Sequence, residues 1–496
     1  MIPWWVLTVL LLGVNFALWG AVGLVRLAES GMRRPPQRAK PVAARDGGAL
    51  PDGDALPDGD AVRDGELTVA DVAVLIPAHN EAVVIGESLR SIMALVPRQN
   101  VYVVSDGSTD DTVQIARRAG AQVIETAKNV GKAGALEEAI ERLGLIRRFA
   151  LVMLLDADTR VQPGYFGAAL PLFADPKVVV VAGCVRTVLD RKLSPAGNVL
   201  VGHRTRIYAV GQRALKFGQT YLRANATPIV PGFASVYRTR VLPHIDMNPP
   251  GLVIEDFNMT FEVYQKRLGK VGFTLGAVAV TQDPDNFRDY VRQTKRWAVG
   301  LWQTVRRHPP RANLFTGMLA LLLLELMTSS VLFVLLPLIL LVLAVPDVAG
   351  SVLSWPWFDE IHRAVSTHVR LSTVLFGVAL PDYLLTCAVA LIERRPRLLL
   401  LGVFFPFLRI LDAAIAVYAI PVAWLSRSSG RWKSPARRVT GTPTLATPAP
   451  VIPALATPAQ ATPAQATPAS AGPALANPAP PAAVARPVPG KVRAVG

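Results

Sequence analysis

Four long apolar segments constrain the fold of this chain more than any other feature of its sequence. They cover residues 2–27, 314–345, 371–392 and 398–425. Each is long enough to cross the roughly 30 Å hydrocarbon core of a bilayer as a helix. The chain is also 51% hydrophobic and only 18% charged, which is too apolar for an ordinary soluble protein of 496 residues. We therefore expect a multi-pass protein of the plasma or inner membrane.

Basic residues beside these segments predict how the chain is oriented. Arginines follow the first segment rather than precede it, so the positive-inside rule places the next region in the cytoplasm. A signal peptide is the alternative, but no basic stretch precedes the apolar run. The net charge of +16 lies mostly beside apolar segments, which suits the lipid bilayer rather than nucleic acid.

The number of crossings stays open. Four spans would return the C-terminus to the outside, whereas the basic stretch at 427–438 favours the inside. The last apolar segment contains Pro406, Arg409 and Asp412, so part of it could lie in the interface or re-enter the membrane.

Composition divides the chain into six regions of different character. They are an N-terminal transmembrane helix (1–28), a basic and Asp/Gly-rich linker (29–70), a cytoplasmic domain (71–310), transmembrane or interfacial helices (311–426), a basic juxtamembrane segment (427–440) and a disordered Ala/Pro/Thr-rich tail (441–496).

The region between residues 71 and 310 predicts an α/β fold. Short β-rich runs alternate there with stretches of helical spacing, such as 81–95 and 132–143. This alternation predicts a mostly parallel sheet with flanking helices. Ligands bind at the carboxyl ends of such strands, so polar residues there are candidates for the site. The predicted strands are 72–76, 101–105, 121–125, 151–156 and 178–183.

Acidic residues follow the first two predicted strands. Glu81 closes the stretch Pro-Ala-His-Asn-Glu, and Asp106 opens the stretch Asp-Gly-Ser-Thr-Asp-Asp. A carboxylate at such a turn can accept hydrogen bonds from a nucleobase or ribose. The second half of the latter stretch, with Asp110 and Asp111, also fits the start of a helix.

A pair of carboxylates at the end of another strand predicts a metal site. Asp156 and Asp158 are separated by one residue, so strand alternation points both to one side. Their repulsion is relieved if a divalent cation joins them, and Mg²⁺ or Mn²⁺ suits both oxygen ligands and a diphosphate. Lys132, near the start of a predicted helix, suits a diphosphate too, although a surface lysine is the plain alternative.

Two further motifs precede the second apolar segment. Glu255 and Asp256 open an amphipathic helix, where a carboxylate could deprotonate an acceptor hydroxyl or only favour the helix dipole. Gln293, Arg296 and Trp297 share one helix face. Arginine can neutralise phosphate and tryptophan can stack on a sugar, but both also anchor helices at membrane surfaces.

Together these motifs resemble the family 2 processive glycosyltransferases of the GT-A fold, which include cellulose, chitin, hyaluronan and poly-N-acetylglucosamine synthases. The resemblance extends from about residue 72 to residue 303 and includes the flanking apolar segments. It implies roles for the residues already named. Glu81 and Asp106 would contact the nucleoside, and Lys132 would contact the nucleotide portion of the donor. Asp156 and Asp158 would form the D-x-D pair, with Asp158 as the direct metal ligand, and Asp256 beside Glu255 would be the base. The diphosphate would be held, and the acceptor site bordered, by Gln293, Arg296 and Trp297.

The resemblance implies an inverting transfer from a nucleotide-sugar donor, such as UDP-N-acetylglucosamine, to a growing β-linked polysaccharide. The sequence departs from the family in reading Ser-Asp-Gly where many members have Asp-Asp-Gly, and in having one apolar segment before the catalytic domain. The latter is more like the chitooligosaccharide synthases of nodulation. A single addition to a lipid or lipid-linked acceptor stays open, as does a non-catalytic transporter or scaffold, against which the full set of carboxylates argues.

Overall fold

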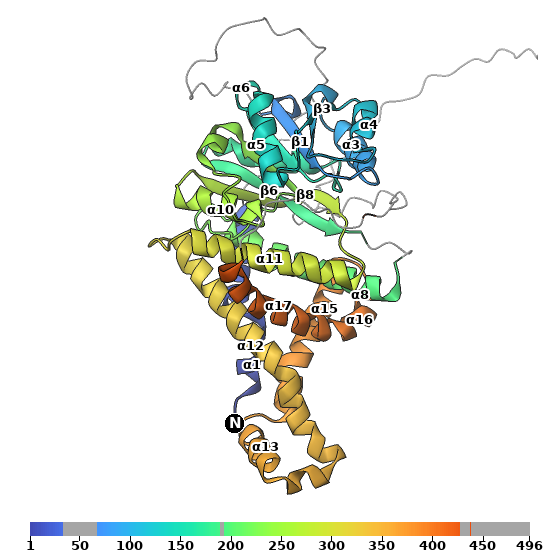
Figure 1. The fold of residues 1–496 in the computed structure, drawn as a ribbon. Helices are drawn as coiled ribbons and strands as arrows, with labels where there is room; N and C mark the ends of the chain where they lie inside the picture. Colours follow the sequence, from blue (N-terminus) through green and yellow to red (C-terminus); the bar gives the residue numbers. More distant parts are fainter. Residues whose placement is uncertain (33–66, 189–192, 427–436, 438–496) are drawn as a thin grey trace, which may run out of the picture. The chain divides into compact units, whose positions relative to one another are not determined.

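The computed structural model of the chain describes residues 1–32, 67–188 and 193–426, together with residue 437. Most of the predicted linker and of the basic segment, and the whole of the Ala/Pro/Thr-rich tail, lie outside these described residues. Within them, an α/β region precedes a set of long apolar helices (Figure 1).

Among the described residues, a single eight-stranded sheet forms the centre of the α/β region. Its strand order is β3-β2-β1-β4-β7-β6-β8-β5, and every strand except β7 and β5 runs in the same direction. The predicted α/β class with a mostly parallel sheet is therefore confirmed. The strands are β1 (Val72–Ala78), β2 (Val101–Ser105), β3 (Gln122–Glu125), β4 (Leu151–Leu155), β5 (Arg160–Val161), β6 (Val178–Thr187), β7 (Ala234–Arg238) and β8 (Lys270–Thr281).

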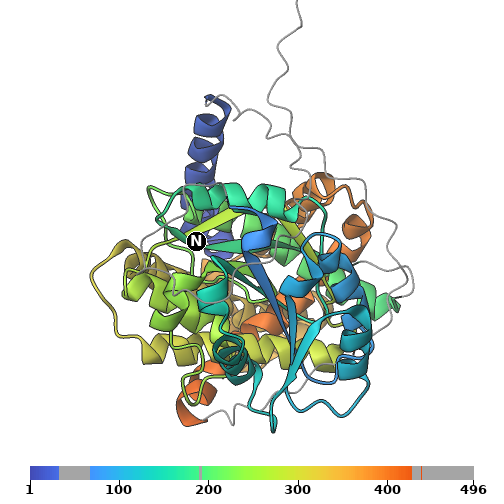
Figure 2. The same cartoon turned by 90° about the horizontal axis from the view of Figure 1, so that it is seen from above.

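Helices cover both faces of this sheet (Figure 2). They are α3 (Ile85–Met93), α4 (Thr112–Ala119), α5 (Lys132–Arg142), α6 (Leu145–Arg148), α7 (Tyr165–Ala169), α9 (Phe217–Gln219) and α10 (Glu255–Gln265). Helix α8 (Pro195–Val210) contacts β6, and α11 (Phe287–Arg307) contacts α8 and α10. A π-helical segment, η4 (Gly211–Lys216), joins α8 to α9.

Strand β1 shows why these residues form a buried parallel strand. All seven of its residues are buried. Val74 and Ile76 pack with side chains of α3 and α4, whereas Ala73 and Leu75 pack with those of α5 and α10. A strand covered on both faces reads as a continuous apolar run. The polar residues that follow it are thereby left at the edge where the carboxyl ends of the parallel strands meet.

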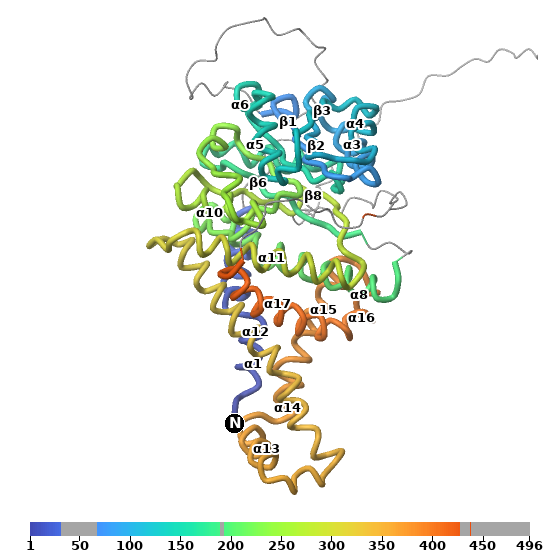
Figure 3. Tube along the Cα trace, viewed as in Figure 1, coloured from blue at the N-terminus to red at the C-terminus, as the bar shows by residue number. Residues whose placement is uncertain are grey.

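The second half of the chain holds the apolar helices, which Figure 3 traces from α12 through α13 to α14. Three helical stretches there are long and apolar enough to cross a membrane: Leu314–Val348, Leu371–Ile392 and Arg397–Leu425. This is compatible with membrane association. The helices are α12 (Leu314–Val348), α13 (Pro356–His368), α14 (Leu371–Val374), α15 (Leu380–Ile392), α16 (Arg397–Leu401) and α17 (Phe405–Leu425).

The first apolar segment is not the single helix that its composition predicts. It forms α1 (Trp4–Leu12) and α2 (Val14–Met32), which are bent by 66° at their junction. Gly13 at this break has a φ of 82°. Glu325 of α12 accepts hydrogen bonds from the backbone and side chain of Asn15, at 2.9 and 2.8 Å. The carboxylate thus accepts one of the free backbone N–H groups at the start of α2, which stabilises a second helix start within the segment.

Candidate active site

The carboxyl ends of β1, β2 and β4 bring the predicted acidic residues to one edge of the sheet. Glu81 follows β1, Asp106 follows β2, and Asp156 and Asp158 follow β4. These strands are neighbours in the order β2-β1-β4 and run parallel. The topology therefore gathers residues that lie up to 77 positions apart, as Glu81 and Asp158 do.

Lys132, at the first position of α5, lies at the centre of the cluster. Its ammonium nitrogen is 2.8 Å from Asp156 Oδ1 and 2.8 Å from Glu255 Oε1. Burial opposes its charge, but the two carboxylates outweigh burial and raise the pKa of Lys132 well above its ordinary value. The lysine thus joins the end of β4 to the start of α10.

Asp256 belongs to the same cluster. Its Oδ2 accepts a hydrogen bond from the backbone N–H of Gly232 at 2.8 Å. A side chain at Gly232 would collide with Asp256 and approach Lys132, so only glycine lets this backbone come so close. Asp156, Glu255 and Asp256 are therefore neighbours around one ammonium group.

The pKa values of the two adjacent carboxyl groups of α10, Glu255 and Asp256, shift in opposite directions. Burial raises the pKa of Asp256 to about 7, and the charge of Glu255 adds to this effect. Burial acts on Glu255 in the same direction, but Lys132 and, more weakly, Arg296 hold the pKa of Glu255 below its ordinary value. Such a split between two neighbouring acids suits a pair in which one residue stays charged while the other exchanges protons.

Asp158 faces a different cation from Asp156. Its Oδ1 accepts hydrogen bonds from the hydroxyls of Thr159 and Thr281, at 3.2 and 3.3 Å. Its Oδ2 pairs with the guanidinium of Arg437. The same guanidinium donates to both carboxylate oxygens of Glu81, at 2.8 and 3.0 Å.

The carboxylates of Asp156 and Asp158 suit a divalent cation whose coordination is completed by phosphate groups of the substrate. Among the described residues, no group of three or more His, Cys, Asp or Glu side chains is arranged to hold a metal by itself. Mg²⁺ sites commonly take only one or two carboxylates together with substrate phosphates, and Asp156 and Asp158 can supply those. That both would bind one ion stays a prediction, because they pair with Lys132 and Arg437 respectively.

Asp106 is fully buried and serves the loop before α5. Its two oxygens accept hydrogen bonds from the backbone N–H groups of Val130 and Gly131, at 2.8 and 2.9 Å. The next residue, Gly107, has a φ of 64°, as a sharp turn after the strand requires. In this arrangement Asp106 positions the loop that delivers Lys132, while its predicted contact with the nucleoside stays a prediction.

Helix α11 carries the remaining predicted residues, Gln293, Arg296 and Trp297. Arg296 lies near enough to Glu255 to affect its pKa. The side-chain oxygen of Gln293 is buried and has no hydrogen-bond partner among the described residues. The three residues thus belong to a helix beside the cluster, and Arg296 acts on the cluster through its effect on Glu255.

Arg204 of α8, which no sequence motif indicated, contacts this helix. Its guanidinium lies between two rings, 4.4 Å from that of Tyr290 and 4.5 Å from that of Trp297, and donates to Thr294 at 2.6 Å. The three partners lie on one face of α11, at i, i+4 and i+7. Since they are about 90 positions from Arg204 in the sequence, no local pattern could have revealed the contact.

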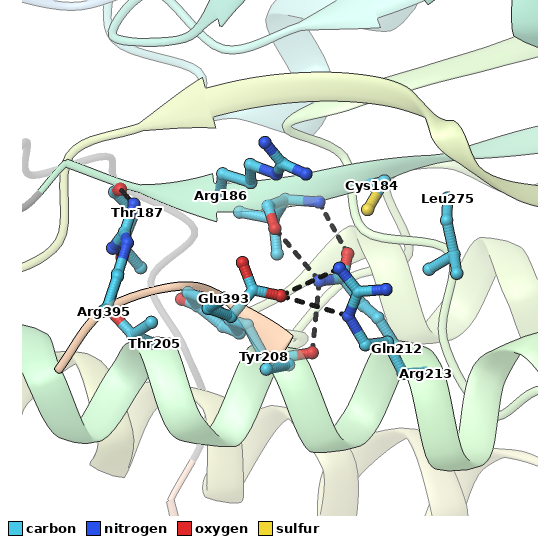
Figure 4. A pocket seen from close by; sticks show the side chains of 12 residues that line it. Cys184, Arg186, Thr187, Thr205, Tyr208, Gln212, Arg213, Leu275, Glu393 and Arg395 are labelled. Carbon is cyan, nitrogen blue, oxygen red and sulfur yellow. Dashed lines mark hydrogen bonds and ion pairs between the residues drawn. The ribbon is translucent and has the colours of Figure 1, made fainter. Parts of the chain in front are cut away.

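A separate cavity lies between β6 and α8 (Figure 4). Arg213 and Glu393 pair across it at 2.9 Å, and Gln212 binds the backbone of Val185. The volume of this cavity is about 20 Å³. That is enough for a water molecule but too small for a sugar. None of the predicted site residues lines this cavity, so it is not the candidate active site.

Comparison with known proteins identifies relatives of the α/β region. Residues 70–300 match the family described as glycosyltransferase like family 2. The chain is 28% identical over 244 residues to the uncharacterized glycosyltransferase YaiP of Escherichia coli, a match covering 47% of this chain and 57% of YaiP. It is 27% identical over 245 residues to the probable glycosyltransferase YdaM of Bacillus subtilis, covering 46% and 54%. The chain thus matches only about half the length of these relatives.

Among solved structures, the chain is similar to a mannosyltransferase from Pyrobaculum calidifontis in complex with GDP-Man and Mn²⁺. The identity is 18%, the TM-score is 0.46, and the match covers 83% of this chain and 97% of that one. The sheet topology of the described residues and the family match over residues 70–300 agree on a GT-A-like fold. Residues 70–300 therefore form a glycosyltransferase family 2 domain.

Proposed function

We propose that this enzyme transfers a sugar from a UDP-sugar, such as UDP-N-acetylglucosamine, to a growing β-linked polysaccharide at the membrane, with inversion at the anomeric carbon. The observation that supports it best is the group formed by Lys132, Asp156, Glu255 and Asp256. It holds one ammonium group for a diphosphate and one carboxylate whose pKa, at about 7, suits a general base.

The chemistry follows from the charges of these side chains. Asp256 would take the proton from the acceptor hydroxyl as its oxygen attacks the anomeric carbon. The bond from that carbon to the diphosphate oxygen would then break, and the nucleoside diphosphate would leave. Lys132 would face the charge that develops on the leaving group, while Glu255 stays ionised beside Lys132 and holds it in place.

A divalent cation would complete the donor site. Mg²⁺ or Mn²⁺, bound by Asp158 with Asp156 and by the donor's phosphate oxygens, would neutralise charge on the departing diphosphate. Asp158 is 8% exposed, so its carboxylate is held in a nearly water-excluded place where a cation would strongly stabilise it.

Proximity to apolar helices favours an acceptor at the bilayer. Helix α11, which ends at Arg307, leads after six residues into α12, whose apolar stretch begins at Leu314. A growing polysaccharide and a lipid-linked acceptor would both approach along this border. Single addition to a lipid is therefore the alternative that the test must exclude.

The test uses the purified full-length chain in detergent. Release of nucleoside diphosphate and the length of the labelled product are measured with labelled UDP-N-acetylglucosamine, UDP-glucose and GDP-mannose, in the presence of Mn²⁺. A ladder of labelled oligomers from one UDP-sugar supports the proposal. A single added sugar favours the lipid acceptor, and no release from any donor contradicts the proposed reaction.

A further inference from the structure

Arg437 lies in the donor site, although it is separated by 279 positions from Asp158 and by 356 from Glu81. The sequence assigns the basic segment around it to lipid headgroups. Instead, the described side chain of Arg437 bridges two carboxylates that follow different strands, β1 and β4. Only 14% of this side chain is exposed.

The two carboxylates need a cation between them. The side chains of Glu81 and Asp158 are only 1% and 6% exposed, and two such buried negative charges repel each other unless a positive charge lies close. Arg437 supplies that charge and donates to both oxygens of Glu81 and to Oδ2 of Asp158. It therefore performs at these residues the electrostatic role that the proposed function assigns to a divalent cation.

Both oxygens of Asp158 already accept hydrogen bonds. Thr159 and Thr281 donate to Oδ1, and Arg437 donates to Oδ2. Each carboxylate oxygen offers about two lone-pair positions, and those of Oδ1 are occupied, so a cation would bind Asp158 through Oδ2, beside the guanidinium of Arg437. Since Mg²⁺ and Mn²⁺ repel a guanidinium, Arg437 is the donor that would have to leave.

We propose, on the basis of the proposed function, that Arg437 competes with the divalent cation for Asp158 and so determines how much metal the enzyme needs. The arginine and the metal cannot both bind Oδ2 of Asp158. The contact of Arg437 with Asp158 must break before the cation binds, so the affinity of the site for the cation is lower than it would be without Arg437.

The size of the effect follows from the contacts. Three charge-assisted hydrogen bonds hold the guanidinium, and each bond to a charged group stabilises a protein enough to change an equilibrium about tenfold or more. Part of this is regained when the released arginine is hydrated. We therefore expect loss of Arg437 to tighten Mn²⁺ binding by roughly tenfold or more.

Calorimetric titration of the full-length chain with Mn²⁺, in the presence of saturating UDP, tests this directly. Arg437→Gln should lower the Kd for Mn²⁺ at least about tenfold, whereas Arg438→Gln, which removes the same charge from the neighbouring position, should leave it unchanged. An unchanged or higher Kd in Arg437→Gln overturns the inference. So does an equal decrease in both variants, which would mean that the general charge of the segment is responsible.

Thermal unfolding provides the second measurement. In the absence of metal, Arg437→Gln should unfold at a lower temperature than the wild type, because Glu81 and Asp158 then lack a neighbouring cation. Addition of Mn²⁺ with UDP should raise the Tm of this variant more than that of the wild type. An equal rise contradicts the competition. If the wild type binds no Mn²⁺ and releases no nucleoside diphosphate from any donor, the proposed function itself is wrong. If it does both while the variants behave alike, only the role of Arg437 is wrong.

Discussion

Lys132→Met is the substitution with the most specific consequences. The lysine makes two ion pairs of 2.8 Å, with Asp156 and Glu255, and its own side chain is only 18% exposed. Its removal leaves three neighbouring carboxylates without their shared cation. Breaking a buried pair by removing one partner costs about 3–5 kcal/mol, and the partial exposure of Asp156, at 32%, favours the lower value, about 3 kcal/mol.

That loss should be measurable in both stability and activity. A cost of about 3 kcal/mol corresponds to a decrease in apparent Tm of about 6–12 °C for a domain of this size. Release of nucleoside diphosphate should also fall on the order of 10²–10³-fold, as when a group facing the transition-state charge is removed. The control is Arg142→Met on the same helix, since Arg142 pairs at the surface with Glu138 and such pairs stabilise by no more than about 1 kcal/mol.

A double variant separates the two roles of Lys132. Lys132→Met with Glu255→Gln removes one charge of each sign, so it should regain much of the lost Tm but none of the lost activity. If Lys132→Met keeps its activity within about threefold, a lysine placed to face the leaving group is the wrong interpretation. If the double variant is no more stable than the single one, repulsion among the carboxylates does not cause the destabilisation.

Three further outcomes follow from the site. Because the pKa of Asp256 is raised to about 7 and a base acts only when deprotonated, kcat should rise with pH through about 7 and fall below it; a kcat that stays level from pH 6 to pH 8 would exclude this titration. Arg204→Met should weaken acceptor binding more than donor binding, and in a Trp297→Phe background it should have little further effect; additive losses would mean that Arg204 does not act through the Trp297 ring. Excess chelator should abolish transfer and added Mg²⁺ or Mn²⁺ restore it; full activity in chelator would remove the metal from the mechanism.

Much of the sheet could be predicted because its central strands are covered on both faces. Strands β1, β2 and β4 read as continuous apolar runs, and their ends fixed where the acidic residues would gather. Strand β7, which runs antiparallel between β4 and β6, was not predicted, because its sequence Ala-Ser-Val-Tyr-Arg is not a continuous apolar run. Strand β8 was not predicted either, because two glycines, Gly272 and Gly276, interrupt it.

What the sequence could not predict depends on contacts between distant residues. The break at Gly13 involves Glu325, more than 300 positions away. The side chain of Asp106 binds a loop about 25 residues later, so its motif alone does not distinguish a ligand contact from a loop contact. Arg437 belonged to a segment whose composition favoured lipid. In each case the sequence shows which residue is present, but it does not show which distant residue that residue contacts.

In the proposed mechanism, Asp256 is the base that activates the acceptor beside the Lys132 cluster. The most direct measurement is sugar transfer by Asp256→Asn, together with the Kd of this variant for UDP in the presence of Mn²⁺. We predict that the Kd changes by less than about threefold, while transfer falls on the order of 10²–10⁴-fold. Transfer at the wild-type rate, with UDP bound equally well, would contradict the assignment of Asp256 and with it the proposed mechanism.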